Sequence, residues 1–206
     1  ELEKFKSRFK GPYIISCKLD GISALYTTGK NSKEGKLYTR GNGTIGQDIT
    51  HLIKDIIWKD NPIHDFETEF AVRGEIIIKR QTFIDKYQTK FANPRNFVAG
   101  LVNKKTIEPE ILKDLDFVAY EVLNPPNLKP SEQMKYIEQN WNTPPVKYEQ
   151  LTPPELSNEL LSNRLIEWRE TYEYEIDGII CSDDNQHPRS NKNPEHAFAF
   201  KMVLSD

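Results

Sequence analysis

Short apolar runs that alternate with helix-like spacing predict a chain of strands and helices. The runs that fit strands cover residues 13–18, 22–27, 36–40, 70–78, 115–123, 175–182 and 197–203. Apolar spacings of three and four predict helices within residues 1–10, 49–57, 82–87, 94–101, 131–137 and 152–168. Residues 22–40 form a predicted hairpin around a turn cluster at 29–32, so the sheet is antiparallel at this point.

Polar residues mark the expected starts of several helices. Asp48, Thr82 and Ser131 each precede a helical pattern and are predicted N-caps. Thr152 and Glu155 enclose two prolines, which fits a capping box with proline in the first turn.

Lys18 lies in an otherwise apolar strand. Because alternate residues of a strand share a face, Ser16, Lys18 and Asp20 point one way, while Cys17 and Leu19 point the other way. A lysine held among apolar neighbours and near other cations loses its proton more easily, and the free amine is a nucleophile. The alternative is a strand lysine that reaches solvent beside a turn, since short motifs also match by accident.

Gly41, Gly43 and Gly46 spell the G-x-G-x-x-G pattern of dinucleotide-binding loops. That fingerprint requires a parallel strand, turn and helix unit, whereas the strand before these glycines closes a hairpin. We therefore favour a tight turn that comes close to a ligand or to DNA.

Other strands offer further candidates for a site. Arg73 and Glu75 share a face of one strand, and a simple salt bridge between them is the alternative to a functional role. Tyr120 fits either the core or a ring stacked on a ligand. In the last strand Lys201 shares its face with alanines, which leave room for a ligand.

Composition describes an ordinary soluble globular protein of 206 residues, with 37% hydrophobic and 29% charged residues and a net charge of −3. This charge balance argues against a dedicated nucleic-acid-binding module, although local clusters of basic residues are compatible with a local contact to nucleic acid. Two isolated cysteines predict a reducing, intracellular setting. The chain has no signal-peptide pattern and no apolar run long enough to cross a membrane.

Six segments, in order, resemble motifs of the adenylation (nucleotidyltransferase) domain of NAD-dependent DNA ligases. They are Lys18-Leu19-Asp20-Gly21, residues 39–50 (TRGNGTIGQDIT), Val72-Arg73-Gly74-Glu75, Asn93-Pro94-Arg95-Asn96 with Ala99-Gly100, Asp177-Gly178-Ile179-Ile180, and Ala197-Phe198-Ala199-Phe200-Lys201. The resemblance runs from about Lys18 to Met202. Such an ordered set is far more specific than any one motif.

The resemblance implies roles for individual residues. Lys18 would be the nucleophile that becomes lysyl-AMP, with Asp20 and Lys201 as catalytic partners. The implied nucleotide-binding set is Ser16, Cys17, Lys18, Leu19, Arg40, Glu75, Tyr120, Ile180 and Lys201, in which Glu75 holds the ribose while Tyr120 and Ile180 enclose the adenine. The implied DNA-binding set is Arg40, Asn93, Arg95 and Asn96. The implied cofactors are NAD, as AMP donor, and Mg²⁺ with unassigned ligands, and the implied partner is nicked double-stranded DNA.

Three positions depart from the family pattern. Ser182 stands where the family has a second lysine, Ser16 where it has an acid that reads the adenine amino group, and Asn103 where it has a further arginine. Without the second lysine, phosphate stabilisation is expected to rest more on Lys201 or on another cation.

We therefore expect an α+β nucleotidyltransferase (ATP-grasp-like) core, with antiparallel sheets flanked by helices, over residues 1–206. It would be a monomeric, intracellular catalytic core that lacks the family's nicotinamide-binding domain and OB-fold. The alternatives are an ATP-dependent polynucleotide ligase or RNA-capping-type transferase, and a non-catalytic nucleic-acid-binding domain.

Overall fold

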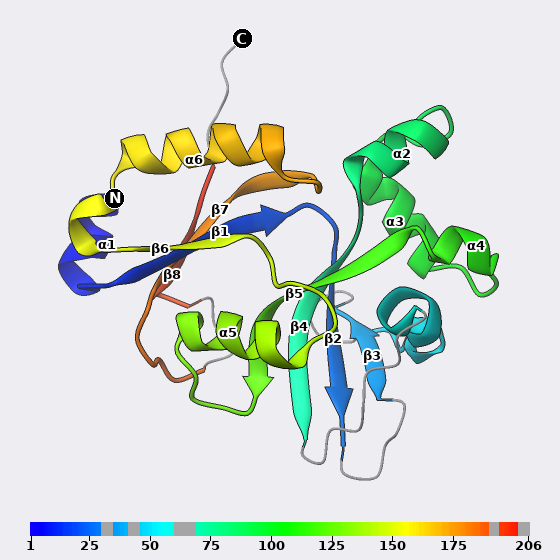
Figure 1. Cartoon of the computed structure of the whole chain (residues 1–206), viewed down its shortest axis with the longest axis horizontal. Coiled ribbons are helices and arrows are strands. Elements are labelled where there is room, and N and C mark those ends of the chain that lie inside the picture. Colours follow the sequence, from blue (N-terminus) through cyan, green and yellow to red (C-terminus); the bar gives the residue numbers. More distant parts are fainter. Residues whose placement is uncertain (30–34, 41–45, 60–68, 190–193, 202–206) are drawn as a thin grey trace.

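Two four-stranded antiparallel sheets form the framework of the protein in a computed structural model, which describes residues 1–29, 35–40, 46–59, 69–189 and 194–201 (Figure 1). The first sheet has the order β6-β1-β7-β8, and the second has the order β3-β2-β4-β5. The strands are β1 Tyr13–Leu19, β2 Ile22–Thr28, β3 Lys36–Thr39, β4 Phe70–Ile78, β5 Leu115–Asn124, β6 Tyr148–Leu151, β7 Ile176–Asp183 and β8 Ala197–Phe200. Every pairing is antiparallel, which confirms the expected α+β class with antiparallel sheets.

The chain passes from the first sheet to the second through two residues, Asp20 and Gly21. A side chain at Gly21 would place its Cβ 2.4 Å from the backbone oxygen of Ile76 and 2.9 Å from Cγ of Glu75. Only glycine therefore allows this turn to lie directly on β4. The turn joins the end of β1, which carries Lys18, to β2 and lies against β4, the strand that carries Glu75.

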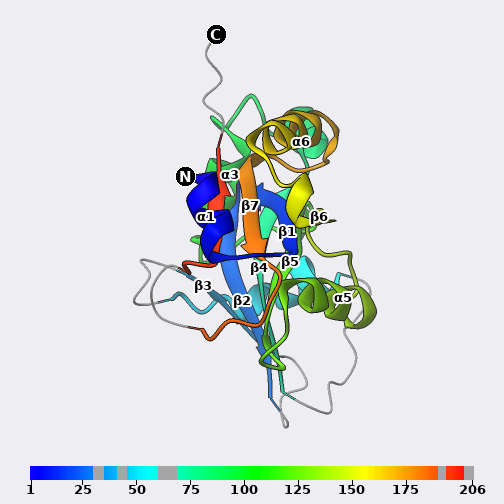
Figure 2. The ribbon, with the colours of Figure 1, turned by 90° about the vertical axis from the view of Figure 1, so that its left-hand side faces the viewer.

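Helices cover the sheets on several sides. The long helix α6 (Asn158–Thr171) runs along β1 and β7, and α5 (Pro130–Asn140) packs on β5 (Figures 1 and 2). Three helices, α2 (Arg80–Lys86), α3 (Pro94–Val102) and α4 (Pro109–Leu112), gather beyond the end of β4. The N-terminal α1 (Leu2–Arg8) packs Phe5 against Phe198 of β8, with ring centroids 4.8 Å apart. Among the described residues, no helix is long and apolar enough to cross a membrane.

Alternation along β1 sends every second side chain into the core. Ile15, Cys17 and Leu19 are buried, as are Leu165 and Trp168 on α6. Ser16 and Lys18 lie on the opposite face and remain partly exposed. The predicted division into two faces is therefore confirmed for residues 16–19, whereas Asp20 lies in the turn after the strand.

Several predicted helix starts are wrong. Asp48 accepts a bond from the Thr50 N–H at 2.9 Å, but the segment that follows is a 3₁₀ turn (η1, Thr50–Leu52) and a π-helical turn (η2, Lys54–Trp58). Thr82 lies inside α2 and Ser131 lies inside α5, and neither side chain caps its helix. Proline and glutamate in the first turn of α5 set its start instead.

The capping box at Thr152 forms, but it closes only the short turn η3 (Pro153–Glu155). The main helix begins later, where the Ser157 side chain accepts a bond from the Leu160 N–H at 3.1 Å. The predicted single helix is therefore two elements.

Candidate active site

Lys18 points at a carboxylate on the neighbouring strand. Its Nζ lies 3.1 Å from Oδ1 and 3.2 Å from Oδ2 of Asp177, and Nζ of Lys201 lies 3.8 Å from Oδ2. Gly178, which lies opposite Lys18, makes room for the Lys201 side chain, because a Cβ at position 178 would lie 3.1 Å from Cγ of Lys201. Two amines and one carboxylate therefore converge at the end of the first sheet.

A β-bulge explains why Asp177 faces Lys18. Simple alternation along β7 would place Asp177 on the core face with Ile179. The register shifts here, so that Lys18 pairs with Gly178 while Leu19 pairs with Ile176, and Asp177 is the extra residue. Bulges of this kind re-aim a side chain next to functional sites. The apolar pattern of the sequence does not reveal this orientation of Asp177, because a bulge leaves no mark in it.

Glu75 brings a buried carboxyl group from the second sheet to the same place. Its side chain is only 9% exposed, and burial raises its pKa from 4.5 to about 8. The charges of Lys18 and Arg95 lower this pKa, while those of Asp177 and Asp20 raise it further. All four charged groups therefore lie close enough to Glu75 to affect its ionisation.

Arg73 does not form the alternative salt bridge with Glu75. Its guanidinium lies 3.1 Å from Oε1 of Glu121 on β5, and Arg189 binds the other oxygen of the same carboxylate. Glu75 is therefore left to the site rather than to a structural ion pair within β4.

Tyr120 lies at a second bulge, opposite the register shift between Arg73 and Gly74. Its hydroxyl is 3.0 Å from that of Ser23 on β2, and its ring is half-buried. Burial raises the pKa of Tyr120 to about 12, so the phenol stays protonated. The ring is thus fixed on the second sheet near Glu75, whose charge contributes to this pKa.

The first sheet presents a row of uncharged residues beside Lys18. Ser16 pairs with Tyr148 on one side and with Ile180 on the other, and Ile180 pairs with Ala199. Residues that lie directly opposite one another share a face of the sheet, so these four extend the face of Lys18. We call this the site face of the first sheet.

Two of the expected nucleotide-binding residues point elsewhere. Cys17 and Leu19 are buried on the opposite side of β1, and burial raises the pKa of the Cys17 thiol to about 12. Their side chains therefore belong to the core.

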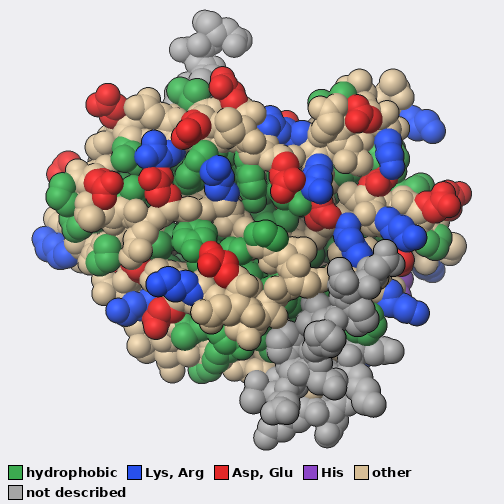
Figure 3. Space-filling view, in the orientation of Figure 1, with side chains coloured by type: hydrophobic (Ala, Val, Ile, Leu, Met, Phe, Trp, Pro, Cys, Tyr) green, Lys and Arg blue, Asp and Glu red, His purple; other side chains and the backbone are tan. Residues whose placement is uncertain are grey.

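The expected DNA-binding residues lie at the edges of the site. Arg40 is exposed after β3, and its N–H donates to the Ser23 carbonyl at 3.2 Å. Asn93 caps α3 by accepting from the Asn96 N–H at 2.8 Å, which leaves Arg95 exposed in the first turn. Lys and Arg side chains, interleaved with acidic ones, gather over α2 to α4 (Figure 3). Gly41 and Gly43 of the glycine-rich pattern lie outside the described residues.

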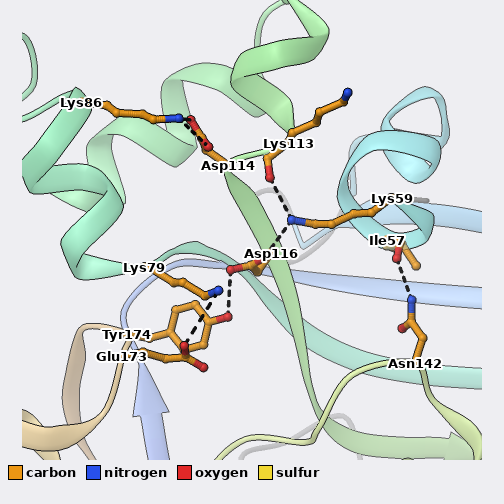
Figure 4. A network of polar contacts seen from close by, with 10 residues as sticks. All are labelled: Ile57, Lys59, Lys79, Lys86, Lys113, Asp114, Asp116, Asn142, Glu173 and Tyr174. Carbon is orange, nitrogen blue, oxygen red and sulfur yellow. Dashed lines mark hydrogen bonds and ion pairs between the residues drawn. The ribbon is translucent and has the colours of Figure 1, made fainter. Parts of the chain in front are cut away.

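A polar network ties the second sheet to the chain that enters β7 (Figure 4). The Tyr174 hydroxyl donates to Oδ2 of Asp116 at 2.8 Å, and Lys59 donates to Oδ1 at the same distance. Lys79, at the end of β4, faces Glu173 at 4.0 Å.

Arg80 strengthens this junction by donating to the carbonyl oxygens of Arg169, Glu170 and Tyr172 at the end of α6. On its other side, the Asp20 N–H donates to the Glu175 carbonyl at 3.0 Å. The segment before β7 is therefore bound both to the turn after Lys18 and to the end of β4. These bonds fix the position of Lys18 relative to Glu75.

The carboxylates of the site do not form a preassembled metal cage. Within the described ranges, no group of three or more His, Cys, Asp or Glu side chains is arranged to hold a metal ion. Mg²⁺ in nucleotide sites, however, usually takes only one or two carboxylates and completes its shell with phosphate oxygens and water. Asp20 and Asp177 both lie close enough to Glu75 to raise its pKa, so two carboxylates are present near the reacting groups.

Solved structures with this fold define its class. The chain aligns with the ATP-dependent DNA ligase of bacteriophage T7 in complex with ATP, with a TM-score of 0.56 and 12% identity, over 97% of this chain and 64% of the other. A mycobacterial DNA ligase D in complex with ATP and MES aligns with a TM-score of 0.56 and 11% identity, over 92% of this chain and 54% of the other. At such identity the likeness establishes the fold alone, which is that of ligase nucleotidyltransferase domains.

Sequence relatives give the family. The model of the NAD-dependent DNA ligase adenylation domain matches residues 2–203, and the chain belongs to this family. It is 42% identical to a DNA ligase of Acanthamoeba polyphaga mimivirus over 97% of this chain, and 32% identical to one of Ehrlichia canis over the whole chain. The chain spans 31% and 33% of these two relatives, about a third of their length.

Proposed function

We propose that this chain is the catalytic domain of a DNA ligase that takes AMP from NAD and passes it to the 5′ phosphate of nicked DNA. The observation that carries this proposal is the convergence of Lys18, Asp177, Lys201 and Glu75 from two sheets. In the first step Nζ of Lys18 forms a bond to the α-phosphorus of NAD. The bond to the nicotinamide mononucleotide phosphate breaks, and that oxygen leaves with the electron pair.

Asp177 prepares the nucleophile. Its carboxylate accepts bonds from the Lys18 ammonium at 3.1 and 3.2 Å, which holds the amine in one direction and offers a nearby acceptor for the proton it must lose. Asp20, in the turn that follows β1, supports the lysine and later the nick.

Lys201 supplies positive charge for the phosphate. Its amine is exposed and lies 3.8 Å from Asp177, so it reaches the side from which the phosphate would approach. Ser182 carries no charge and pairs with Ile14, four residues before Lys18, so stabilisation of the anionic transition state rests on Lys201 and on a bound cation. Mg²⁺ held by Asp20 and Asp177 would neutralise phosphate oxygens when bound.

The remaining residues hold the nucleoside. Glu75 would accept hydrogen bonds from the ribose hydroxyls, and its position beside Lys18 places the ribose next to the reacting phosphate. Tyr120 and Ile180 lie on different sheets, with part of each side chain exposed, and would pack on opposite faces of the adenine.

Nicked double-stranded DNA would lie across Arg40, Asn93, Arg95 and Asn96, next to the basic side chains over α2 to α4. The protein would act on the DNA as a monomer, and it would do so inside the cell. A test is the affinity of an Arg40→Ala variant for a nicked duplex, measured at several salt concentrations. We expect weaker binding and a salt slope smaller by about one. Lys135→Ala, which removes an exposed lysine from α5, is the control and should bind like the parent.

The donor is tested by nick sealing with the complete protein that contains this chain. NAD should support sealing and ATP should not, and Lys18→Arg should seal with neither, because arginine keeps its proton. Sealing with ATP alone would establish the alternative, an ATP-dependent ligase. Tight nick binding with no sealing under any condition would favour a non-catalytic DNA-binding domain.

A further inference from the structure

The side chains on the site face of the first sheet change from charged to uncharged along the strands. The row nearest the reaction holds Lys18, Gly178 and the stem of Lys201. Two residues further on, about 7 Å along the strands, the row is Tyr148, Ser16, Ile180 and Ala199. The third row is Gln150, Ile14, Ser182 and Ala197. The first row is charged, whereas the eight residues of the other two rows carry no charge. In the proposed function the phosphate lies at the first row and the adenine packs on Ile180 of the second row, so the base would lie toward the uncharged rows.

Ser16 and Ser182 stand out in these uncharged rows. Ser16 pairs with Ile180 and Ser182 pairs with Ile14, so the two serines are diagonal neighbours on adjacent strands, about 7 to 8 Å apart. Both are half-buried, and within the described part of the chain neither hydroxyl has a hydrogen-bond partner. Two free hydroxyls therefore point from the same face where a base would lie.

The same two positions are departures from the family pattern, which has an acid in place of Ser16 and a lysine in place of Ser182. The register shows that an acid and a lysine at these positions would lie within reach of each other. Loss of one alone would leave an unpaired charge in a half-buried wall, which is costly. With serine at both positions, this wall carries no charge.

We propose that Ser16 and Ser182 read the edge of the donor's base, and that they accept purines with either an amino group or a carbonyl at position 6. A hydroxyl rotates to donate or to accept, whereas a carboxylate only accepts. A carboxylate would face the carbonyl oxygen of a 6-oxopurine with no proton between them, and such unpaired groups cause strong discrimination. This inference rests on the proposed function, because it assumes that a nucleotide binds along these rows.

The test compares two donors with the complete protein, NAD and nicotinamide hypoxanthine dinucleotide, by following the mass of the covalent adduct over time. We expect the parent to load from both at rates within about tenfold of each other. Ser16→Glu should shift the ratio of the two rates toward NAD by about tenfold or more. Ser7→Glu, which adds the same charge on exposed α1, should leave the ratio unchanged. A shift smaller than tenfold in Ser16→Glu would overturn the inference.

If the Ser16→Glu variant does not fold or does not form the covalent adduct, nucleotide binding to two other variants tests the same inference. Ser16→Ala and Ser182→Ala should each weaken the binding of AMP and of IMP by a similar factor, about twofold to tenfold, measured by calorimetry. Unchanged affinity for both nucleotides in both variants would refute the role of the serines. Failure of the parent to load from NAD would overturn the proposed function alone, since calorimetry still tests the serines without any reaction.

Discussion

Replacing Glu75 with glutamine should make the protein more stable and less active. The cause is the cost of keeping a carboxyl group buried at the site: burial raises its pKa from 4.5 to about 8, against the pull of Lys18 and Arg95. Between these two values the unfolded chain is ionised while the folded chain keeps its proton. The folded state then binds more protons than the unfolded state, so the free energy of unfolding falls as pH rises.

The size of this effect follows from the two pKa values. Neutral pH lies about 2.5 pH units above 4.5, and at about 1.36 kcal/mol per unit the deficit near pH 7 is about 3 kcal/mol. Glutamine has the same shape and no ionisation, so Glu75→Gln should recover at most this amount. For a chain of this length the melting temperature would rise by roughly 6 to 12 °C. The gain should shrink as pH falls toward 4.5, where the unfolded glutamate is also protonated.

Thermal and urea unfolding of the 206-residue chain at about pH 5 and about pH 7 measures this difference. Glu121→Gln on the neighbouring strand is the contrast, because it weakens the bonds to Arg73 and Arg189 and should lower stability. The reasoning is refuted if Glu75→Gln is no more stable than the parent near pH 7, or if its gain is as large near pH 5. Loading of AMP should fall in the same variant, because an amide nitrogen, which only donates, replaces one of the two carboxyl oxygens available to the ribose hydroxyls.

Substitutions at four other positions have definite expected outcomes. Gly21→Ala should cost about 2 kcal/mol or more of unfolding free energy in urea titrations, because its Cβ would meet a backbone oxygen of β4 at 2.4 Å. Gly100→Ala, with open space around it inside α3, should instead gain about 0.5 to 1 kcal/mol, and a loss there would contradict the account. Asp177→Asn should slow AMP loading at saturating NAD about 10²-fold or more without unfolding the chain, whereas a near-normal rate would exclude a role in preparing Lys18. Arg80→Ala should lose about 1.5 to 3 kcal/mol, and Arg80→Lys should restore only part of it, because an ammonium lacks the planar fork that spans several carbonyls.

The strands could be predicted from sequence because a strand that covers a core must alternate apolar and polar residues. Seven of the eight strands in the described part of the chain were expected from this pattern. The exception is β6, a short edge strand whose sequence Tyr-Glu-Gln-Leu does not alternate. Helix starts were less predictable, because many serines, threonines and aspartates compete for the same role. Asn93 and Ser157 accept the capping bonds, whereas Thr82 and Ser131 do not.

The site was predictable where a side chain follows the regular pleat and unpredictable where a bulge turns it. Ser16 and Lys18 share a face, as the alternation of β1 requires. Asp177 and Tyr120 lie at register shifts, and no local pattern reveals where a strand takes an extra residue. The partner of Arg73 was equally hidden, because Glu121 comes from a strand far along the chain.

The central claim is that Lys18 carries AMP, and peptide mapping tests it most directly. The complete protein is incubated with NAD, digested, and searched by mass spectrometry for the peptide that bears AMP. The account predicts one AMP on Lys18, removed when nicotinamide mononucleotide is added, and none in a Lys18→Ala variant. AMP on another lysine, or on the Lys18→Ala variant, would contradict it.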